Sequence, residues 1–280
     1  MKLQIQSLSN CWVGGEVNGN FRTPFSDLSI NYPFDFTLED RPLVILGDSE
    51  LPLVDKFRDR KVIGWLGGEP RVVMPHAYEF AEANIDKFDI IFTFDKDLLS
   101  KNPKFKFCPF GTSTFSDYKD RIIHPKTKQV SIIGNVRYCK HPGHFLRKEI
   151  IENYFHLFDS VKHGWPFEDK RKYINAFRYS VVVENCKQDY YFSEKLIDAL
   201  LVGTIPIYWG CDSILDFGFN PDGIIQFSNA KEIPDILSSI SDTTYKLSLK
   251  AVEENHRVAH KYLQCMQAQW LWDNGIKDLV

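Results

Sequence analysis

The sequence predicts an α/β protein made of two tandem halves, each with a parallel β-sheet. Three observations support this prediction. Short apolar runs end in Gly, Pro or an acidic residue, helical segments separate these runs, and the pattern restarts after a polar stretch at residues 116–128. Strands that alternate with helices are typical of parallel sheets. The length of 280 residues also suits two domains of about 150 residues each.

Apolar runs predict the strands of the first half. The N-terminal residues 1–6 alternate polar and apolar side chains as a strand does. We expect further strands at residues 41–48, 61–66, 88–94 and 105–109, and a helix or helical turn at residues 76–87. Together these elements form a first domain, for which we predict residues 1–125.

The same alternation continues in the second half, for which we predict a domain of residues 126–280. We expect strands at residues 130–134, 179–183, 204–209 and 223–227, and helices at residues 144–158, 168–178, 193–202 and 243–269. The last helical range contains no Gly or Pro. The two halves are expected to face one cleft.

The composition excludes several classes of protein. The 37 acidic and 34 basic residues leave a formal charge of -3, whereas a nucleic-acid-binding protein usually has a basic excess. Hydrophobic residues make up 44% and charged residues 25% of the chain, as in ordinary soluble domains. The longest apolar region, Leu196 to Trp209, is interrupted by Asp198, Gly203 and Pro206, so it predicts no membrane span.

The cysteines and the N-terminus predict an intracellular protein. The six cysteines are scattered and form no Cys-x-x-Cys pair. Their even number permits three disulfides. The first residues, however, lack the continuous apolar stretch of a signal peptide, so free thiols are the preferred interpretation. We therefore expect a cytoplasmic location.

The densest cluster of candidate functional residues follows the apolar strand that ends at Val183. Glu184 and Asn185 come directly after this strand. In open α/β sheets, ligands bind at the carboxyl ends of the strands. Ser193 is a good N-cap, and it begins a helix with Glu194 and Lys195 in the first turn.

A cation in the first turn of a helix opposes the helix dipole, so Lys195 needs an explanation. A diphosphate between the ammonium and the exposed backbone amides would stabilise both. Glu194 could then accept hydrogen bonds from the hydroxyls of a ribose. The alternative, a solvated first turn, is equally compatible with this short segment alone.

The wider segment resembles the donor-site signature of the α1,3/α1,4-fucosyltransferases, glycosyltransferase family 10. The family pattern is F-E-N, a loop, Y-[VI]-T-E-K-L and then a strand with Val/Ile-Pro. In this chain Val183, Phe192 and Ser193 replace the Phe, the aliphatic residue and the Thr. Ser193 keeps the capping oxygen, and the other two stay apolar. The resemblance implies a GT-B fold, in which two Rossmann-like α/β/α domains face a central cleft, and an inverting enzyme that uses GDP-fucose.

The resemblance also implies roles for residues near the strand end. Asn185 and Tyr191 would line the nucleotide pocket, and Glu184 would belong to the floor of that pocket. Glu194 would contact the ribose and Lys195 the phosphates. Without the resemblance, Tyr191 would be read as core packing.

A shorter match precedes this segment. An arginine that reaches the diphosphate in the family corresponds to Arg147, and a family glycine corresponds to Gly164. Arg147 alone would be read as an exposed helix residue. The phosphate role is the preferred interpretation because the longer signature follows downstream.

In the first domain, Gly64-Trp65-Leu66-Gly67-Gly68-Glu69-Pro70 looks like the family's strand and the acid that follows it. The resemblance implies that Glu69 is the catalytic base, because an inverting transfer needs a carboxylate to take the acceptor's proton. A glutamate that caps the turn before Pro70 is the alternative. Asp48 and Glu79 are reserve candidates.

No metal ligand set is predicted. Asp95-Lys96-Asp97 is a D-x-D string of the kind that binds a metal in another glycosyltransferase architecture, but it lies in the half opposite the donor signature. His141-x-x-His144 lacks an acidic or Cys companion. We expect no required cofactor, with Mn²⁺ or Mg²⁺ as a possible stimulating ion.

These observations predict an inverting transferase that moves L-fucose from GDP-fucose to a hydroxyl of an oligosaccharide or glycoconjugate acceptor. Lipopolysaccharide and protein glycosylation are the acceptor classes we expect, with peripheral contact at the inner membrane. No nucleic-acid partner is expected. Two alternatives stay open: a GT-B transferase with another GDP-sugar donor, or a sugar-nucleotide or glycan-binding protein without turnover. By analogy with the fold, the C-terminal helix packs back on the first domain.

Overall fold

The structure is a computed structural model that describes residues 3–7, 16–17, 20–21, 34–37, 39–109, 113–115, 118–137, 139–163 and 169–280. It divides into two compact units. Unit 1 comprises Met1–Phe110 and Leu263–Val280, and unit 2 comprises Gly111–Tyr262. The boundary therefore precedes the predicted one between residues 125 and 126, and the last residues belong to unit 1.

Unit 1 contains a six-stranded sheet in which all neighbouring strands run parallel. In sheet order, the strands are β4 (Phe34–Thr37), β1 (Leu3–Ser7), β5 (Leu43–Gly47), β6 (Lys61–Leu66), β7 (Ile90–Thr93) and β8 (Phe105–Phe107). Two further short strands, β2 (Glu16–Val17) and β3 (Asn20–Phe21), form an antiparallel pair. The α-helices of the unit are α1 (Pro75–Ala83), α2 (Lys96–Lys101) and α9 (Gln264–Asp273).

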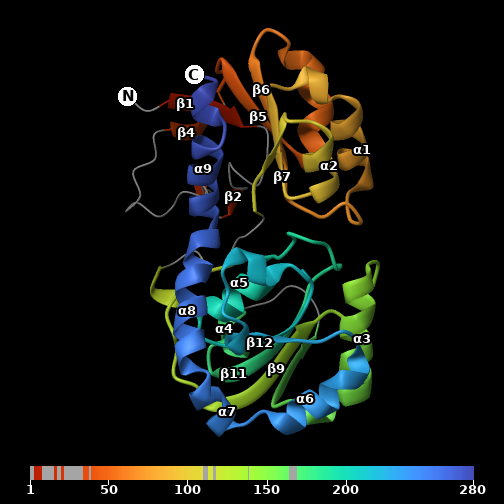
Figure 1. Ribbon diagram of the computed structural model, residues 1–280, viewed down its shortest axis with the longest axis vertical. Helices are drawn as coiled ribbons and strands as arrows, with labels where there is room; N and C mark the ends of the chain where they lie inside the picture. The colour runs from red at the N-terminus through yellow and green to blue at the C-terminus, as the bar shows by residue number, and fades with distance from the viewer. Residues whose placement is uncertain are drawn as a thin grey trace. The chain divides into compact units, whose positions relative to one another are not determined.

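Helices cover the two faces of this sheet (Figure 1). On one face, Val44 and Ile91 pack in a core cluster with residues of α1 and α2. On the other face, the space beside Gly275, just after α9, is filled by Ile90 and Phe92. Successive residues of a strand point to opposite faces, so a strand covered on both sides reads as a continuous apolar run.

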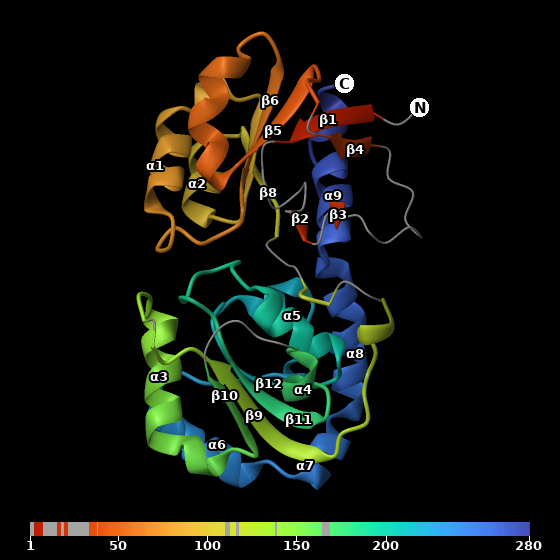
Figure 2. The ribbon, with the colours of Figure 1, turned by 180° about the vertical axis from the view of Figure 1, so that it is seen from behind.

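Unit 2 contains a five-stranded parallel sheet. In sheet order, the strands are β10 (Ser160–His163), β9 (Lys128–Gly134), β11 (Phe177–Val183), β12 (Ile205–Trp209) and β13 (Ile225–Gln226). The helices are α3 (Pro142–Tyr154), α4 (Arg171–Ile174), α5 (Glu194–Leu201), α6 (Ile233–Ser239), α7 (Asp242–Leu247) and α8 (Leu249–Ala259). Helices α3 and α6 lie on one face, and α4, α5 and α8 lie on the other (Figure 2).

Strand β11 lies at the centre of the unit 2 sheet, between β9 and β12. Val181 and Val183 pack with Leu146 and Ile151 of α3 in the main core cluster. Ser131 and Ser180 are buried, and their hydroxyl oxygens lie 3.0 Å apart in a hydrogen bond between β9 and β11. The central position places the residues after Val183 at the middle of the sheet edge.

The predicted strands are confirmed, but two predicted helices are wrong in extent. Of the range predicted as a helix, the described residues 169–178 contain only the short α4, and β11 already begins at Phe177, where the chain pairs with Lys128 of β9. Residues 243–269 do not form one helix. The first part, α7, ends at Leu247, and the backbone N–H of the next residue, Ser248, donates to the carbonyl oxygens of Thr244 and Tyr245 in a tight turn. A second break precedes α9, where Leu263 is extended.

Four cysteines whose side chains the structure describes, Cys108, Cys139, Cys186 and Cys211, have free thiols. Within the described ranges, no helix has the length and apolar character needed to span a bilayer.

Candidate functional site

The carboxylate of Glu184 organises the carboxyl end of β11. Its side chain is fully buried and accepts hydrogen bonds from the backbone N–H of Ser193 at 2.9 Å and from the Ser193 hydroxyl at 2.5 Å. Burial raises the pKa of Glu184, whereas the charge of Lys195, whose Nζ lies 3.7 Å from Oε2, lowers it. Glu184 thereby holds the residue that begins α5.

The first turn of α5 presents an ion pair. Ser193 caps the helix by accepting from the Lys195 backbone N–H. The Lys195 ammonium donates to Glu194 Oε1 at 3.1 Å and to the Ser193 hydroxyl at 3.0 Å. Burial would raise the pKa of Glu194, but the charges of Lys195 and Lys170 outweigh it and lower the pKa to about 2. Glu194 is therefore ionised at neutral pH.

Arg147 of α3 reaches the same strand end. Its Nε donates to the Gly143 carbonyl at 3.1 Å and its Nη2 donates to Asn185 Oδ1 at 3.0 Å. Neither acceptor is a carboxylate, and Arg147 forms no ion pair with any residue that the structure describes. Among the described residues, its guanidinium thus has no carboxylate at ion-pair distance, and the charges of Glu184 and Glu194 act on it from further away.

His144 orients the amide that holds Arg147. The backbone N–H of Lys140 donates to Nδ1 of His144 at 3.2 Å, so Nδ1 is the unprotonated nitrogen and Nε2 donates to Asn185 Oδ1 at 3.2 Å. Burial, followed by the charge of Arg147, lowers the pKa of His144 to about 4. The imidazole is neutral at pH 7 and acts as a hydrogen-bond donor to Asn185.

A glycine allows α3 to approach β11. A Cβ at Gly143 would lie 1.7 Å from the carbonyl oxygen of Glu184, and the Gly143 backbone N–H donates to the Asn185 carbonyl at 3.0 Å. No larger residue fits this contact without backbone movement. This close approach brings Arg147, one turn further along α3, to the carboxyl end of β11.

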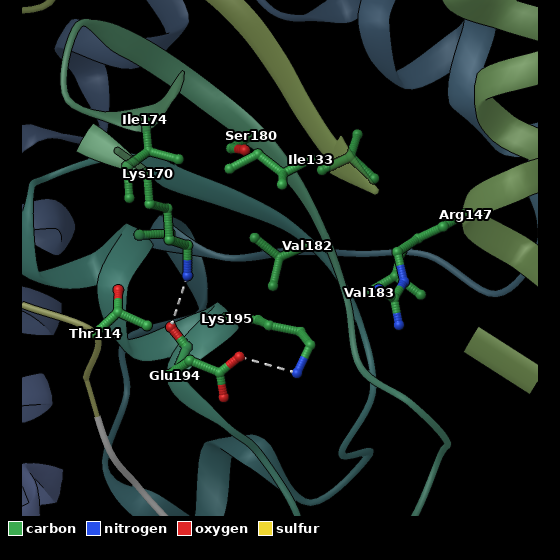
Figure 3. A pocket seen from close by; sticks show the side chains of 12 residues that line it. Thr114, Ile133, Arg147, Lys170, Ile174, Ser180, Val182, Val183, Glu194 and Lys195 are labelled. Carbon is green, nitrogen blue, oxygen red and sulfur yellow. Dashed lines mark hydrogen bonds and ion pairs between the residues drawn. The ribbon is translucent and has the colours of Figure 1, made fainter. Parts of the chain in front are cut away.

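These elements surround a cavity of about 340 Å³ within unit 2 (Figure 3). Arg147 lies at one end of the cavity, Lys170 and Thr114 lie at the other, and Glu194 and Lys195 lie between them. The remaining lining residues are Ile133, Ile174, Ser180, Val181, Val182, Val183 and Ala199. The cavity thus combines charged groups at several points with an apolar wall, as nucleotide and other ligand sites do.

The predicted donor-site residues take three different positions. Arg147, Glu194 and Lys195 line the cavity. Asn185 contacts Arg147 from beside the cavity. Glu184 and Tyr191 are not among the lining residues, and both are buried, at 0% and 1% exposed. Gly164 lies outside the described residues.

Glu69 lies in unit 1, in the loop after β6. It is half-buried, and its carbonyl oxygen accepts from the hydroxyl of Tyr78 at 2.8 Å. The neighbouring backbone N–H groups of Gly67 and Gly68 donate to Asp48 at 3.0 and 2.9 Å. Burial raises the pKa of Asp48 to about 7, and the charge of Glu69 adds to this shift. The other reserve candidate, Glu79, has a side chain that is 70% exposed.

The residues of the D-x-D string have protein partners. Asp95 caps α2 and pairs with Arg71 at 2.9 Å, and Asp97 pairs with Lys101 at 2.7 Å. Among the described residues, no group of three or more His, Cys, Asp or Glu side chains is placed to hold a metal ion.

Lys170 and Asp198 are functional candidates that sequence reasoning missed. Lys170 lines the cavity and pairs with the fully buried Asp198 at 2.6 Å. Asp198 could have been noticed as the one acidic residue on an otherwise apolar helix, after the first turn of EKLIDALL. Lys170 stands in a charged run, Glu168 to Lys172, where the sequence offers no signal that singles it out.

Comparison with known proteins gives one match in sequence. No protein-family model matches the chain. The α-(1,3)-fucosyltransferase of Helicobacter pylori is 30% identical to it over 77 residues. These residues make up 28% of this chain and 16% of the relative, so the match spans a small part of that protein.

Solved structures match over most of the chain. An α1,3-fucosyltransferase with GDP-fucose superposes with a TM-score of 0.56 and 19% identity, over 91% of this chain and 82% of that one. An α-glucosyltransferase in complex with UDP and DNA has a TM-score of 0.59 and 12% identity, over 96% and 99% of the two chains. Anabaena HepE with UDP has a TM-score of 0.57 and 10% identity, over 98% and 99%. These similarities confirm the predicted GT-B fold, and over 77 residues the chain is similar in sequence to the Helicobacter pylori α-(1,3)-fucosyltransferase.

Proposed function

We propose that this chain, as a relative of the α1,3-fucosyltransferases with a GT-B fold, transfers L-fucose from GDP-fucose to a hydroxyl of a glycan acceptor with inversion at C1. The observation that supports this proposal most directly is the cavity of unit 2. There, the unpaired cation Arg147 and the Lys195–Glu194 pair at the start of α5 line the same space.

The diphosphate of the donor is proposed to bind at the Arg147 end of the cavity. A guanidinium without a carboxylate partner can form charge-assisted hydrogen bonds to phosphate oxygens. Asn185 and Gly143 hold its Nη2 and Nε on one side, so the remaining donors are free to face a ligand. The amides at the start of α5 and the ammonium of Lys195 add positive potential.

The ribose is proposed to bind at Glu194. The carboxylate is ionised and is paired with Lys195. When a diphosphate binds, Lys195 can turn to the phosphates, and Glu194 can then accept hydrogen bonds from the vicinal hydroxyls. Lys195 and Glu194 thus exchange their contact with each other for contacts with the ligand, so neither charge is left buried and unpaired.

The transfer itself is proposed to be a single displacement. Glu69 takes the proton of the acceptor hydroxyl as its oxygen attacks C1 of fucose from the face opposite the diphosphate. The bond between C1 and the diphosphate oxygen breaks, and GDP leaves with its charge stabilised by Arg147 and Lys195. With these two cations present, we propose that no metal is required and that Mn²⁺ or Mg²⁺ could act only as a stimulating ion.

The acceptor is proposed to be an oligosaccharide or glycoconjugate, with lipopolysaccharide and protein-linked glycans as the classes to test. For the location of this reaction we propose the cytoplasm, with peripheral contact at a membrane. Solved relatives of the same fold bind UDP, so donor choice is the part of the proposal that needs the most direct test.

Calorimetry with GDP, GDP-fucose, GDP-mannose and UDP-glucose tests the donor, and hydrolysis of each sugar nucleotide tests turnover. We expect GDP and GDP-fucose to bind and GDP-fucose alone to be hydrolysed. Arg147→Met should weaken GDP binding by about 10- to 100-fold, since hydrogen bonds to charged groups contribute about 1.5–3 kcal/mol.

Lys148→Met is the matched control, because Lys148 is the next residue of α3 and contacts Glu152 at 3.8 Å. It should bind GDP as the unmodified protein does. Absence of GDP binding to the unmodified protein would overturn the proposed function. Turnover of GDP-mannose but not of GDP-fucose would show that the donor sugar is mannose, and the proposed binding site for GDP would still stand.

A further inference from the structure

A second lysine lies at the end of the cavity away from Arg147 (Figure 3). The Lys170 ammonium donates to Oδ2 of Asp198 at 2.6 Å and to the carbonyl oxygen of Glu194 at 3.3 Å. The Lys170 side chain is 15% exposed and the Asp198 side chain is 0% exposed. The ammonium is therefore held in place at the cavity wall.

Asp198 is itself fixed by several donors. It accepts from the Ser113 hydroxyl at 2.6 Å, from the Thr114 backbone N–H at 3.1 Å and from the Thr114 hydroxyl at 2.5 Å. These contacts join α5 to the segment that begins unit 2. They hold the carboxylate in one position. Because the supporting residues are locked, the lysine presents its donors in a defined direction.

The two ends of the cavity differ in charge. Arg147 has only neutral partners, so its positive charge is available to an anion. Lys170 has a carboxylate partner at ion-pair distance, so the pair is neutral overall and attracts an anion weakly. A neutralised ammonium still donates hydrogen bonds. It therefore suits an uncharged acceptor, such as a ring nitrogen or a carbonyl oxygen.

The order of the groups along the cavity matches the order of the parts of a nucleotide. Figure 3 places Glu194 and Lys195 between Arg147 and Lys170. If the diphosphate binds at Arg147 and the ribose at Glu194, the base extends towards Lys170. Ile174, which lies beside Lys170 in Figure 3, lines the cavity there and offers apolar contact for a ring.

Purine bases differ in the edge that a lysine would meet. Guanine presents two acceptors, O6 and N7, whereas adenine presents the acceptor N7 beside the donor amino group at C6. Asp198 and the Glu194 carbonyl engage two of the three N–H bonds of Lys170. The third N–H can be shared between O6 and N7 of guanine, whereas on adenine it meets the amino group beside N7. We propose that Lys170, positioned by Asp198, recognises the O6 and N7 edge of guanine and makes the site selective for guanine nucleotides. This inference rests on the proposed function, because it assumes that a nucleoside diphosphate occupies the cavity.

Calorimetry with GDP, IDP, ADP and UDP, on the unmodified protein and on Lys170→Met, tests the inference. Inosine keeps O6 and N7 but lacks the amino group at C2, so IDP should bind nearly as well as GDP. We expect GDP to bind about 10- to 100-fold more tightly than ADP. In Lys170→Met, GDP and IDP should lose about 10-fold in affinity, while ADP should change little.

Two further variants separate recognition from stability. Lys172→Met removes an exposed lysine of α4 two residues away and should leave the GDP-to-ADP ratio unchanged. Lys170→Arg keeps a cationic donor and should retain most of the preference for GDP. Thermal unfolding of each variant shows whether the fold persists.

A measurement on the ligand needs no variant. The diphosphate of 2-aminopurine riboside lacks the 6-oxo group of guanine, and it should bind to the unmodified protein about as weakly as ADP. Binding of this analogue as tight as that of GDP, or an unchanged GDP-to-ADP ratio in a folded Lys170→Met, overturns the role of Lys170. Failure of every nucleoside diphosphate to bind the unmodified protein overturns the proposed function instead.

Discussion

Asp48 in unit 1 and Glu184 in unit 2 occupy corresponding positions in two parallel sheets. Each directly follows a strand that is buried throughout or nearly so, β5 for Asp48 and β11 for Glu184. Each is buried itself, with 8% and 0% of its surface exposed. Each accepts backbone N–H groups from a nearby loop. At this position, each of the two sheets therefore has a buried carboxylate that holds a loop through hydrogen bonds to its backbone.

The two carboxylates differ in their charged neighbours. Glu184 has the ammonium of Lys195 at 3.7 Å, whereas Asp48 forms no ion pair within the part of the chain that the structure describes. Burial raises the pKa of both groups, and only at Glu184 does a cation oppose the shift. The Asp48 loop leads to the proposed base, and the Glu184 loop leads to charged groups of the cavity. A buried carboxylate thus organises a loop in both units, while an added cation makes a charged binding site in one.

The largest expected effect comes from the residue that the Asp48 loop presents. Glu69→Gln removes the proposed base and should lower kcat by about 100- to 10,000-fold. Binding of GDP, which we assign to unit 2, should not change. A steady-state transfer assay and calorimetry measure the two quantities.

Glu79→Gln is the control for this change, because it alters an exposed carboxylate of the same unit. It should transfer fucose at the normal rate. Transfer by Glu69→Gln at an unchanged rate would show that the base lies elsewhere, with Asp48 as the next candidate.

A smaller effect is expected from Glu184→Gln, which removes a negative charge beside Lys195 and alters the acceptor of the Ser193 hydroxyl. The free energy of unfolding should fall by about 1–3 kcal/mol, as for other buried polar groups that lose a partner. GDP binding should weaken as well, because the start of α5 is no longer held. Urea unfolding and calorimetry provide the measurements.

The comparison for this variant is Glu152→Gln, in which the altered side chain is 57% exposed. Its stability should be close to that of the unmodified protein. If Glu184→Gln proves equally stable and binds GDP normally, the buried carboxylate does not organise α5.

A change that depends on pH is expected for Asp48→Asn. The pKa of Asp48 in the folded chain is about 7, above its ordinary value of 3.8. The folded state therefore binds this proton more tightly than the unfolded state, and its contribution to stability declines as pH rises from about 4 to 7. Asn does not titrate, so the variant should lack this decline, which is at most about 1.4 kcal/mol per pH unit.

Urea unfolding at pH 4.5, 5.5 and 6.5 measures this decline as the difference between variant and unmodified protein. The difference should grow in favour of the variant as pH increases. Asp86→Asn, at an exposed position of unit 1, serves as the control. A pH-independent difference for Asp48→Asn would contradict the raised pKa.

The sequence predicted much of the fold because its signals are local. The strand from residue 179 to 183 is apolar and β-branched, which is typical of a strand covered on both faces. The cap at Ser193 and the charged pair that follows it depend on neighbouring residues only, and the structure contains both. Arg147 was predicted through a family resemblance, and the structure places it in the cavity.

Other features depend on residues that are far apart in the chain. Lys170 and Asp198 are 28 positions apart, and Thr114 is 84 positions from Asp198. No periodicity or spacing links such residues before the chain folds. Tyr191 was predicted to line the nucleotide pocket, but it is buried and is not among the residues that line the cavity. Its burial also depends on how distant segments pack.

By itself, the amino-acid sequence determined the order and type of the strands, the helix that begins after Ser193 and the chemical identity of the charged groups, because each depends on short-range preferences. Only the tertiary structure decided which charges are neutralised. Among the described residues, Lys170 has a buried carboxylate at ion-pair distance, whereas Arg147 has no carboxylate within that distance. Burial and partner distance set the free energy of a charge, and both arise only when distant segments pack together.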